Sequence, residues 1–334
     1  MGIKSLKALI TKYSNNGTSK IHLSKLNNKT LAVDANVYIY KHLYGNKNHI
    51  DGIFFMINKL KKFNINPIFV FDGKPPDEKR AKIIERKLIK NKLEKRLNDL
   101  RLNISENVDN TQIYSEIDKI EKKILYVDKT IIDKTIQLLD LMGVAYIQAD
   151  CEAEHYCSKL SRLSLVDGVI SEDTDTLACG SKLVIREFSN KSDYVVCYNT
   201  DEILYDMDIN YTSFLDMCIL LGTDYNPRLK GYTIDQIYEL IKKYGSIYTL
   251  INSSIISNIA YDYKVIQSII NLEHIKPDIL KLLSQLKKQH KQLELISFLK
   301  KFSSIDEETF VHRIKLIYKS KENKLNNKSY VPPC

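Results

Sequence analysis

Apolar residues in the first part of the chain follow two different spacings. Thr30–Asp34 and Ile68–Phe71 are short, nearly continuous apolar runs, which are typical of strands buried on both faces of a sheet. Between them, Asn36–Leu43 and Ile50–Phe63 carry apolar residues three or four positions apart, which is the spacing of amphipathic helices. A strand, a helical segment and a second strand in this order predict a parallel βαβ unit.

A third apolar run, Gly168–Ser171, is followed directly by acidic residues. Asp173 and Asp175 therefore lie just past the C-terminal end of a predicted strand. In open parallel sheets this edge is where ligands bind, because loops and helix N-termini there surround a crevice. Two close carboxylates repel each other by about 4 kcal/mol at an effective dielectric constant of about 20. The sequence therefore predicts that a cation binds at this edge.

The same spacings predict the remaining elements. Strands are predicted at Val144–Gln148 and, as a hairpin, at Leu183–Phe188 and Tyr194–Tyr198. Helices are predicted at Thr130–Met142, Asp150–Leu163, Tyr211–Leu221, Ile234–Tyr244, Tyr263–Leu272, Ile279–Leu299 and Phe310–Tyr318, with Asp150 as an N-cap. The predicted fold class is α/β, with a mostly parallel central sheet flanked by helices and a C-terminal helical region.

The segment Asp77–Val127 departs from the sheet pattern. Two amphipathic helical patterns on either side of the polar break Ser105–Asn110 predict a helical hairpin that projects from the domain. Charged helices of this kind are usually solvated surface. The first helix, however, closely follows a strand end and is dense in cations: Lys79, Arg80, Lys82, Arg86, Lys87, Lys90, Lys92, Lys95 and Arg96. Lys79 and Arg86 are two helical turns apart, so they face the same way.

Composition narrows the class of protein. The chain has 334 residues, of which 44% are hydrophobic and 27% charged, and no apolar run is as long as a membrane span, which indicates a soluble globular protein. A net charge of +9 indicates a polyanionic partner, because cations gather in the helical hairpin and again after Lys276. The start lacks a secretory signal pattern, and six cysteines without close pairing indicate free intracellular thiols.

Seven acids fall at predicted strand ends or near the ends of helices: Asp34, Asp72, Glu152, Glu154, Asp173, Asp175 and Asp224. Each alone has an ordinary explanation, since Asp34 and Asp224 could be helix caps and Glu152 could form a surface ion pair. Gathered on one edge, however, they form a set of hard oxygen ligands without histidine or cysteine. Such a set favours Mg²⁺ or Mn²⁺ over zinc.

Two details of the segment CEAEHYC qualify this set. Glu152 and Glu154 are two residues apart, so both reach one site only if Glu152 lies at an irregular first turn of its helix. Cys151, His155 and Cys157 share the same helix and could suggest zinc. Zinc is not favoured, because no second ligand pair lies at the spacing of a zinc finger.

Six segments carry a more specific signal. MGIKSL, AVDANVYIY, PIFVFDGKPP, CEAEHYC, SEDTDTL and LLGTDY occur in this order between Met1 and Tyr225, with Lys79 and Arg86 after the third. In order and spacing they resemble the flap endonuclease family of structure-specific 5′ nucleases. The resemblance implies a PIN-like nuclease core, an arch of helices over the site and a helix-hairpin-helix that grips duplex DNA.

The resemblance also implies roles for individual residues. The family's metal ligands fall on all seven acids, and its cofactor is a pair of Mg²⁺ ions, for which Mn²⁺ could substitute. Its catalytic residues fall on Lys79, Arg86, Asp34, Asp72, Glu154 and Asp173. Its DNA contacts fall on Gly2, Tyr40, Lys74, Lys79, Arg80, Arg86 and Gly231, with Tyr40 as a base-stacking residue.

Two departures from the family pattern limit what carries over. Gly231-Tyr232-Thr233 keeps only the first glycine of the hairpin's glycine-x-glycine, and the C-terminal SYVPPC has no glutamine-initiated aromatic box for a sliding clamp. We therefore expect a degenerate helix-hairpin-helix and no clamp tethering. The expected domains are residues 1–225, a nuclease core with an arch at about 77–127; residues 226–319, a helical DNA-binding region; and residues 320–334, a disordered tail.

These observations predict a Mg²⁺-dependent endonuclease that cuts branched, 5′-flap or nicked-duplex DNA in replication, repair or recombination, without a membrane partner. The alternatives are a 5′→3′ exonuclease or Holliday-junction resolvase on the same fold, and a non-catalytic scaffold that binds branched DNA. A small-molecule phosphohydrolase would not explain the basic hairpin. Frequent Lys, Asn and Ile and no Trp are typical of an AT-rich genome, that of a large DNA virus or a eukaryote. The expected location is the nucleus or, for a viral protein, the host nucleus or a cytoplasmic replication site.

Overall fold

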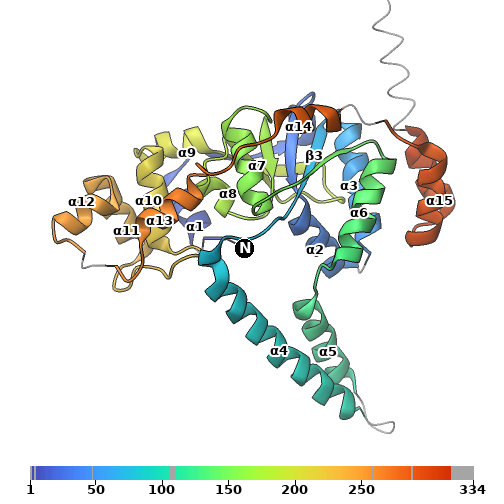
Figure 1. Cartoon of the computed structure of the whole chain (residues 1–334), viewed down its shortest axis with the longest axis horizontal. Helices are drawn as coiled ribbons and strands as arrows, with labels where there is room; N and C mark the ends of the chain where they lie inside the picture. The colour runs from blue at the N-terminus through green and yellow to red at the C-terminus, as the bar shows by residue number, and fades with distance from the viewer. Residues whose placement is uncertain are drawn as a thin grey trace, which may run out of the picture.

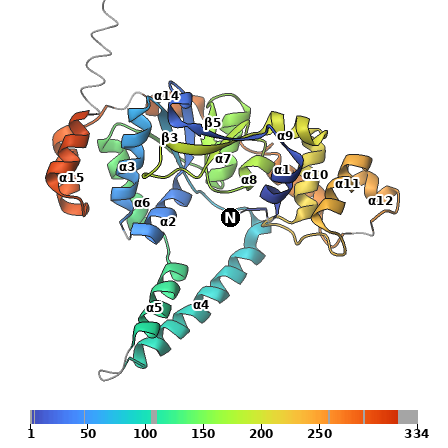
Figure 2. The same cartoon turned by 180° about the vertical axis from the view of Figure 1, so that it is seen from behind.

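Seven strands form one mixed sheet at the centre of the protein (Figure 2). The structure is a computed structural model that describes residues 2–3, 5–46, 48–104, 110–256, 259–286 and 289–316. In sheet order the strands are β1 (Thr18–His22), β7 (Tyr194–Asn199), β6 (Leu183–Arg186), β5 (Gly168–Ile170), β2 (Thr30–Asp34), β3 (Asn66–Phe71) and β4 (Ala145–Gln148). The strands from β6 to β4 are parallel, and β7 pairs antiparallel with β6 and β1. The predicted α/β class with a mostly parallel sheet is confirmed.

Alternate residues of the parallel strands face two separate apolar cores. In β2, Ala32 belongs to one core, whereas Leu31 and Val33 belong to the other. In β3, Ile68 and Phe69 divide between the cores in the same way. Because both faces of these strands are covered, the strands appear in the sequence as continuous apolar runs.

Helices from distant parts of the chain cover each face. The first core contains residues of α1 (Leu6–Tyr13), α7 (Ala153–Arg162), α9 (Thr200–Met207), α10 (Tyr211–Leu221), α11 (Ile234–Tyr244), α12 (Ile247–Asn252), α13 (Tyr263–Ile270) and α14 (Ile279–Leu286). The second contains residues of α2 (Ala35–Asn46), α3 (His49–Lys62), α6 (Lys129–Leu141), α15 (Gln292–Phe302) and a helix over residues 307–316. Helices on both sides of residue 225 thus share the cores, and the expected domain division stays a prediction. Within the described ranges, no helix is long and apolar enough to cross a membrane.

Two helices project from this body as an arch (Figure 1). The short 3₁₀ turn η2 (Asp77–Lys79) leads into α4 (Arg80–Leu102), and α5 (Thr111–Ile124) returns beside it. The predicted hairpin is confirmed, although Lys79 lies in the turn before the first helix rather than inside it. Of the predicted polar break, residues 105–109 lie outside the described part of the chain.

The two arch helices hold each other through a small contact of their own. Its buried residues are Leu97, Leu100 and Ile120. Two ion pairs cross between the helices, Arg96 to Glu116 at 3.1 Å and Arg101 to Glu121 at 2.8 Å. Exposed ion pairs contribute only about 0–1 kcal/mol each, so the apolar contact is the main source of the arch's own stability.

Helix α7 begins later than the sequence predicts. Asp150 does not cap it: the helix begins at Ala153, and Glu152 occupies the N-cap position with an extended backbone. The N–H of Ala153 donates to Oδ1 of Asp72 at 2.8 Å, so a carboxylate from the end of β3 satisfies the first free N–H of the helix. The prediction for Asp150 was wrong because a tertiary contact replaces the local cap.

The predicted continuous helix Ile279–Leu299 was also wrong. It is divided into α14 and α15, and residues 289–291 are not helical. There the N–H of Lys291 donates to the carbonyl of Leu141 at 2.8 Å, and the backbone approaches Gly143, where a Cβ would lie 2.7 Å from the backbone nitrogen of His290. The helix is interrupted because its backbone packs against the end of α6.

Several short elements are not predicted by the hydrophobic pattern. They are α1, β1, the 3₁₀ turn η1 (Leu23–Leu26), the single turn α8 (Asp175–Ala178), α9 and α12. Elements of this length show too few apolar positions for a period to be recognised. The predicted helix Phe310–Tyr318 is described as helical up to residue 316, and its last two residues lie outside the described part.

The corrected start of α7 can be tested with two exposed aspartates. Asp128 is a true cap, because its Oδ1 accepts from the N–H of Ile131 at 2.8 Å. We expect Asp128→Ala to lower the free energy of unfolding by about 1 kcal/mol. Asp150→Ala should lower it by less than about 0.5 kcal/mol, since the side chain caps no helix. Urea unfolding followed by circular dichroism compares the two, and equal losses would contradict the assignment.

Candidate active site

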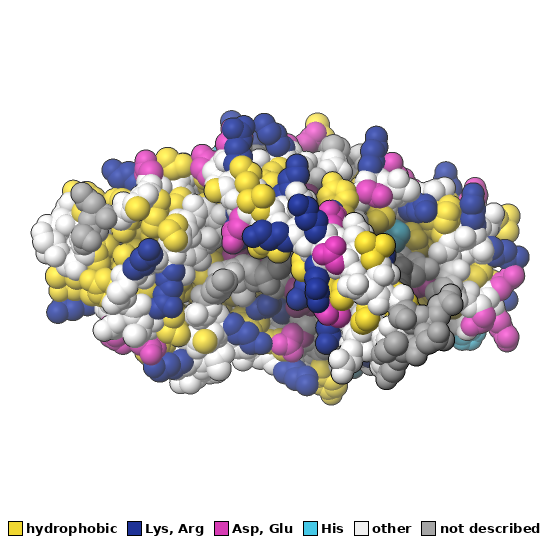
Figure 3. All heavy atoms as spheres, turned by 90° about the horizontal axis from the view of Figure 1, so that it is seen from below, with side chains coloured by type: hydrophobic (Ala, Val, Ile, Leu, Met, Phe, Trp, Pro, Cys, Tyr) yellow, Lys and Arg dark blue, Asp and Glu magenta, His cyan; other side chains and the backbone are white. Residues whose placement is uncertain are grey.

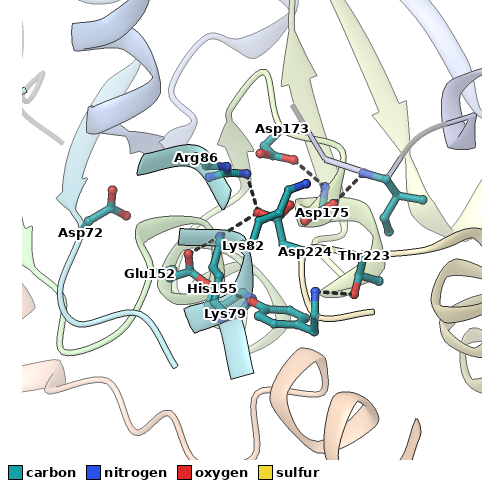
Figure 4. A network of polar contacts seen from close by, with 12 residues as sticks. Asp72, Lys79, Lys82, Arg86, Glu152, His155, Asp173, Asp175, Thr223 and Asp224 are labelled. Carbon is teal, nitrogen blue, oxygen red and sulfur yellow. Dashed lines mark hydrogen bonds and ion pairs between the residues drawn. The ribbon is translucent and has the colours of Figure 1, made fainter. Parts of the chain in front are cut away.

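The structure brings all seven predicted acids to one edge of the sheet. Asp34 ends β2, Asp72 follows β3, and Asp173 and Asp175 follow β5, so four of the acids come from three neighbouring parallel strands. The other three lie at the start of α7 and just after α10. Figure 4 shows Glu152, Asp173, Asp175 and Asp224 gathered around Lys79 and Arg86 of the arch, with Asp72 to one side.

Burial and crowding disfavour the charged forms of five of these acids. Desolvation and the neighbouring Asp72 raise the pKa of Asp34 to about 8. Desolvation, followed by the charge of Asp173, raises the pKa of Asp175 to about 8. The pKa values of Glu154, Asp173 and Asp72 are also raised, chiefly by desolvation. These acids can all ionise together near neutral pH only if positive charge lies close to them.

Two cations at the base of the arch supply part of that charge. The Nζ atom of Lys79 pairs with Oε1 of Glu152 and lies 3.0 Å from Oδ2 of Asp224. The Nη2 atom of Arg86 lies 2.8 Å from the same oxygen of Asp224. Burial lowers the pKa of Lys79, but Glu154 and Glu152 outweigh this effect and raise it overall. Burial likewise raises the pKa of Asp224, yet the two cations hold it below its ordinary value.

The start of the chain packs directly against two of the acids. The N–H of Ile3 donates to Oδ1 of Asp175 at 2.8 Å, and the N–H of Asp175 donates to Oδ1 of Asp173 at 3.0 Å. Gly2 has a φ of +89°, and a Cβ at this position would lie 2.1 Å from Oδ1 of Asp173. Both the backbone conformation and the close approach therefore require glycine at this position.

Two of the acids also serve the local structure. Oδ1 of Asp34 accepts from the N–H of Val37 at 3.3 Å, so the helix-cap explanation holds for this residue as well. Its Oδ2 accepts from the hydroxyl of Ser171 at 2.9 Å. Asp72 caps α7, as described above. These contacts fix the direction in which the two carboxylates point.

The remaining predicted DNA contacts lie apart from the acids. Tyr40 is 37% exposed, and its hydroxyl accepts from the N–H of Val127, where the chain returns from the arch. Lys74 is exposed, and Arg80 forms a local ion pair at 3.1 Å with an acid three residues before it. Gly231 lies in the loop before α11, with open space where a Cβ would point. No hydrogen bond or ion pair in the described ranges joins these four to the seven acids, and their roles stay predictions.

Two further residues lie next to Glu152: His155, which the sequence suggests only as a possible zinc ligand, and Tyr225, to which it assigns no role. The hydroxyl of Tyr225 donates to Oε2 of Glu152 at 2.8 Å, and Nε2 of His155 lies 3.2 Å from the same hydroxyl. Burial lowers the pKa of His155 to about 4. Tyr225 belongs to the LLGTDY segment, but a contact with a residue 73 positions away leaves no local sequence signal.

The donor set at this edge fits a hard divalent cation. Within the described ranges, the side chains able to hold a metal include a group whose ligand atoms lie within 4.8 Å of one another, formed by Glu152, Glu154 and His155. Cys151 and Cys157 do not belong to this group, which gives no support to the zinc alternative. Carboxylate oxygens in excess over cationic partners are the ligands that Mg²⁺ and Mn²⁺ prefer. Lys79 and Arg86 compensate part of a charge that metal ions would compensate more fully.

Comparison with known sequences places the chain among nucleases. The family model of the XPG N-terminal domain matches residues 1–93, and that of the XPG I-region matches residues 143–224. Flap endonuclease 1 of Scheffersomyces stipitis is 31% identical over 283 residues, which cover 79% of this chain and 72% of the relative. Flap endonuclease 1 of Enterocytozoon bieneusi is 33% identical over 269 residues, which cover 75% of this chain and 72% of the relative.

Solved structures share the fold. The catalytic core of Rad2 in complex with DNA substrate is 25% identical, with a TM-score of 0.63 and coverage of 94% of this chain and 99% of that one. Flap endonuclease-1 from Methanococcus jannaschii has a TM-score of 0.68 and covers 96% of this chain and 99% of its own, but at 21% identity it supports the fold alone. From the sequence relatives, the two matching domains and the motif order, it follows that the chain belongs to the flap endonuclease family.

Proposed function

We propose that this protein is a divalent-metal-dependent, structure-specific 5′ nuclease that hydrolyses DNA carrying a 5′ flap. The observation that carries the proposal is the meeting of seven carboxylates from distant parts of the chain at one sheet edge, directly beneath an arch with two cations at its base. A non-catalytic scaffold would have no use for an acid cluster that destabilises itself by repulsion. The family relationship supports DNA as the substrate.

We propose that the seven acids hold two Mg²⁺ ions. Such ions supply an activated water and neutralise charge on the phosphate that is cut. The contacts of the acids prepare them for this task. Ser171 and the N–H of Val37 fix Asp34, and the N–H groups of Ile3 and Ala153 fix Asp175 and Asp72. The fold thus orients these three carboxylates.

Lys79 and Arg86 have a second task in this proposal. Both are donors on the arch side of the acids, where a phosphodiester would have to lie in order to reach them. Lys79 is 7% exposed, so a charge-assisted hydrogen bond to phosphate would form in a partly desolvated site, where it is stronger than in water. We propose that both cations move from Asp224 to the scissile phosphate when DNA binds.

The remaining DNA contacts are proposed from where the residues lie on the surface. Figure 3, which looks onto the face that carries the arch, shows Lys and Arg side chains interspersed with acids across the middle of the molecule. Tyr40 lies where the arch rejoins the body, so its exposed ring is placed to stack on a base. Lys74, Arg80 and Gly231 are proposed to contact the backbone of the duplex.

A nuclear location, or a viral replication site, is proposed from the eukaryotic relatives and the composition.

Cleavage of matched substrates tests the proposed function. We expect end-labelled 5′-flap DNA to be cut near its junction in Mg²⁺ or Mn²⁺ and to remain intact in EDTA. Nicked duplex and a four-way junction should be cut more slowly. Asp173→Ala should reduce cleavage by at least about 100-fold, because even outer partners of metal ligands cost 10–100-fold. Equal or faster cleavage of the four-way junction would contradict the flap assignment.

The two arch cations should affect catalysis more than binding. Lys79→Ala and Arg86→Ala are each expected to lower single-turnover cleavage by about 100- to 1,000-fold, the effect of removing one donor from a developing charge. The affinity for flap DNA should change by less than 10-fold, since one phosphate contact among many is lost. Lys92→Ala is the matched control, because Lys92 is an exposed lysine of α4, the helix that carries Arg86. A loss confined to DNA affinity would refute this role.

The raised pKa values predict a pH-dependent effect of metal on stability. Asp34 and Asp175 have pKa values of about 8 in the folded protein and ordinary values near about 3.9 when unfolded. The metal-free fold therefore holds extra protons, and its stability falls as pH rises through this window. Thermal unfolding in EDTA should show a lower Tm at about pH 8 than at about pH 6. Excess Mg²⁺ should raise Tm more at the higher pH, and a Tm unaffected by Mg²⁺ at both would contradict the proposal.

A further inference from the structure

The two oxygens of Glu152 have different partners. Oε1 pairs with Lys79 at the base of the arch, and Oε2 accepts a hydrogen bond of 2.8 Å from the hydroxyl of Tyr225. Lys79 must leave this carboxylate if it moves to a phosphate or if a metal ion binds at Oε1. The hydroxyl of Tyr225 donates to the other oxygen, Oε2, so this hydrogen bond can remain when Lys79 leaves. The hydroxyl of Tyr225 is therefore the contact that still orients Glu152 in the loaded enzyme.

His155 completes this contact from the other side. Its Nε2 lies 3.2 Å from the hydroxyl of Tyr225, and the imidazole is 1% exposed. The single proton of the hydroxyl is donated to Glu152, so the hydroxyl oxygen must accept from His155. The tautomer that fits carries its proton on Nε2. The result is a chain of two hydrogen bonds from His155 through Tyr225 to Glu152.

This chain joins two elements that each carry predicted metal ligands. His155 is on α7, next to Glu154, and Tyr225 directly follows Asp224 in the loop after α10. Within the loop, the N–H of Tyr225 donates to Oγ1 of Thr223 at 3.1 Å, which helps to hold the backbone of Tyr225 in place. A fixed loop and a fixed hydroxyl set the distance between the acids of α7 and the acid after α10.

We propose that Tyr225 and His155 are positioning residues that hold Glu152 in the direction required for divalent-cation binding. The inference rests on the proposed metal-dependent function. It identifies two residues that position a metal ligand rather than contact the metal ion itself. Outer partners of this kind fix the rotamer of a ligand and typically change metal affinity by about 10- to 100-fold. Neither residue contacts the substrate in this proposal. Although His155 belongs to the group of side chains able to hold a metal, its Nε2 donates to Tyr225 here instead of binding the ion.

Metal binding without DNA is the direct test. Calorimetric titration with Mn²⁺ should show a Kd about 10-fold or more higher for Tyr225→Phe than for the wild type, because the ring remains and only the hydroxyl is lost. Tyr238→Phe is the matched control: its hydroxyl is buried and donates to the carbonyl of Met207 at 3.0 Å rather than to one of the seven acids. The control should bind Mn²⁺ as the wild type does, although it too loses a hydroxyl that forms a hydrogen bond inside the protein.

Variants of His155 separate positioning from packing. His155→Gln retains a side-chain N–H that can donate to Tyr225, so it should keep Mn²⁺ affinity within about 3-fold of the wild type. His155→Leu removes the donor and should bind as weakly as Tyr225→Phe. With flap DNA, excess Mg²⁺ should restore the kcat of Tyr225→Phe while the KM for DNA stays unchanged. A purely structural role would not be rescued by metal.

The outcomes distinguish this inference from the proposed function. Wild-type affinity for Mn²⁺ in Tyr225→Phe would overturn the positioning role and leave the nuclease proposal standing. Equal weakening in Tyr225→Phe and Tyr238→Phe would also overturn it, because general destabilisation would then explain both. A wild-type protein that binds no Mn²⁺ would overturn the metal-dependent function and this inference together.

Discussion

Repulsion among carboxylates at the carboxyl edge of the sheet is the constraint on which the site depends. Parallel strands place their ends side by side, so acids that follow β2, β3 and β5 cannot avoid one another. Desolvation, with the charges of neighbouring acids as the next cause, raises the pKa values of Asp34 and Asp175. A fold that keeps such a cluster has to supply compensating charge, and this one does so with side chains of the arch and with backbone N–H groups.

The same compensation links the arch to the body. Lys79 and Arg86 both pair with one oxygen of Asp224, so the base of α4 is tied to the loop after α10. The arch helices otherwise contact mainly each other, through a small apolar contact. The ion pairs of Lys79 and Arg86 therefore help to hold the arch over the acids, and a substrate phosphate or a metal ion would compete for these pairs. Movement of the arch away from the acids and binding of DNA or metal would therefore break the same ion pairs.

The sequence predicted those parts of the structure that have a local signal. Buried parallel strands are continuous apolar runs, and the acids at their ends were recognisable because strand ends fall at one edge. The start of α7 could not be predicted, because Ala153 is capped by Asp72, which is distant in the sequence. The interruption between α14 and α15 depends on packing against Gly143. The contact of Tyr225 with Glu152 likewise exists only after folding has brought α7 and the loop after α10 together.

The central claim is that the seven acids act as one metal-binding cluster. Anomalous X-ray scattering from crystals soaked in Mn²⁺ measures this most directly, because it locates the ions without reference to activity. The account predicts anomalous peaks within coordination distance of Asp34, Glu154 and Asp173, and displacement of Lys79 from Glu152. Peaks only at other surfaces, or none at this edge under saturating Mn²⁺, would contradict it.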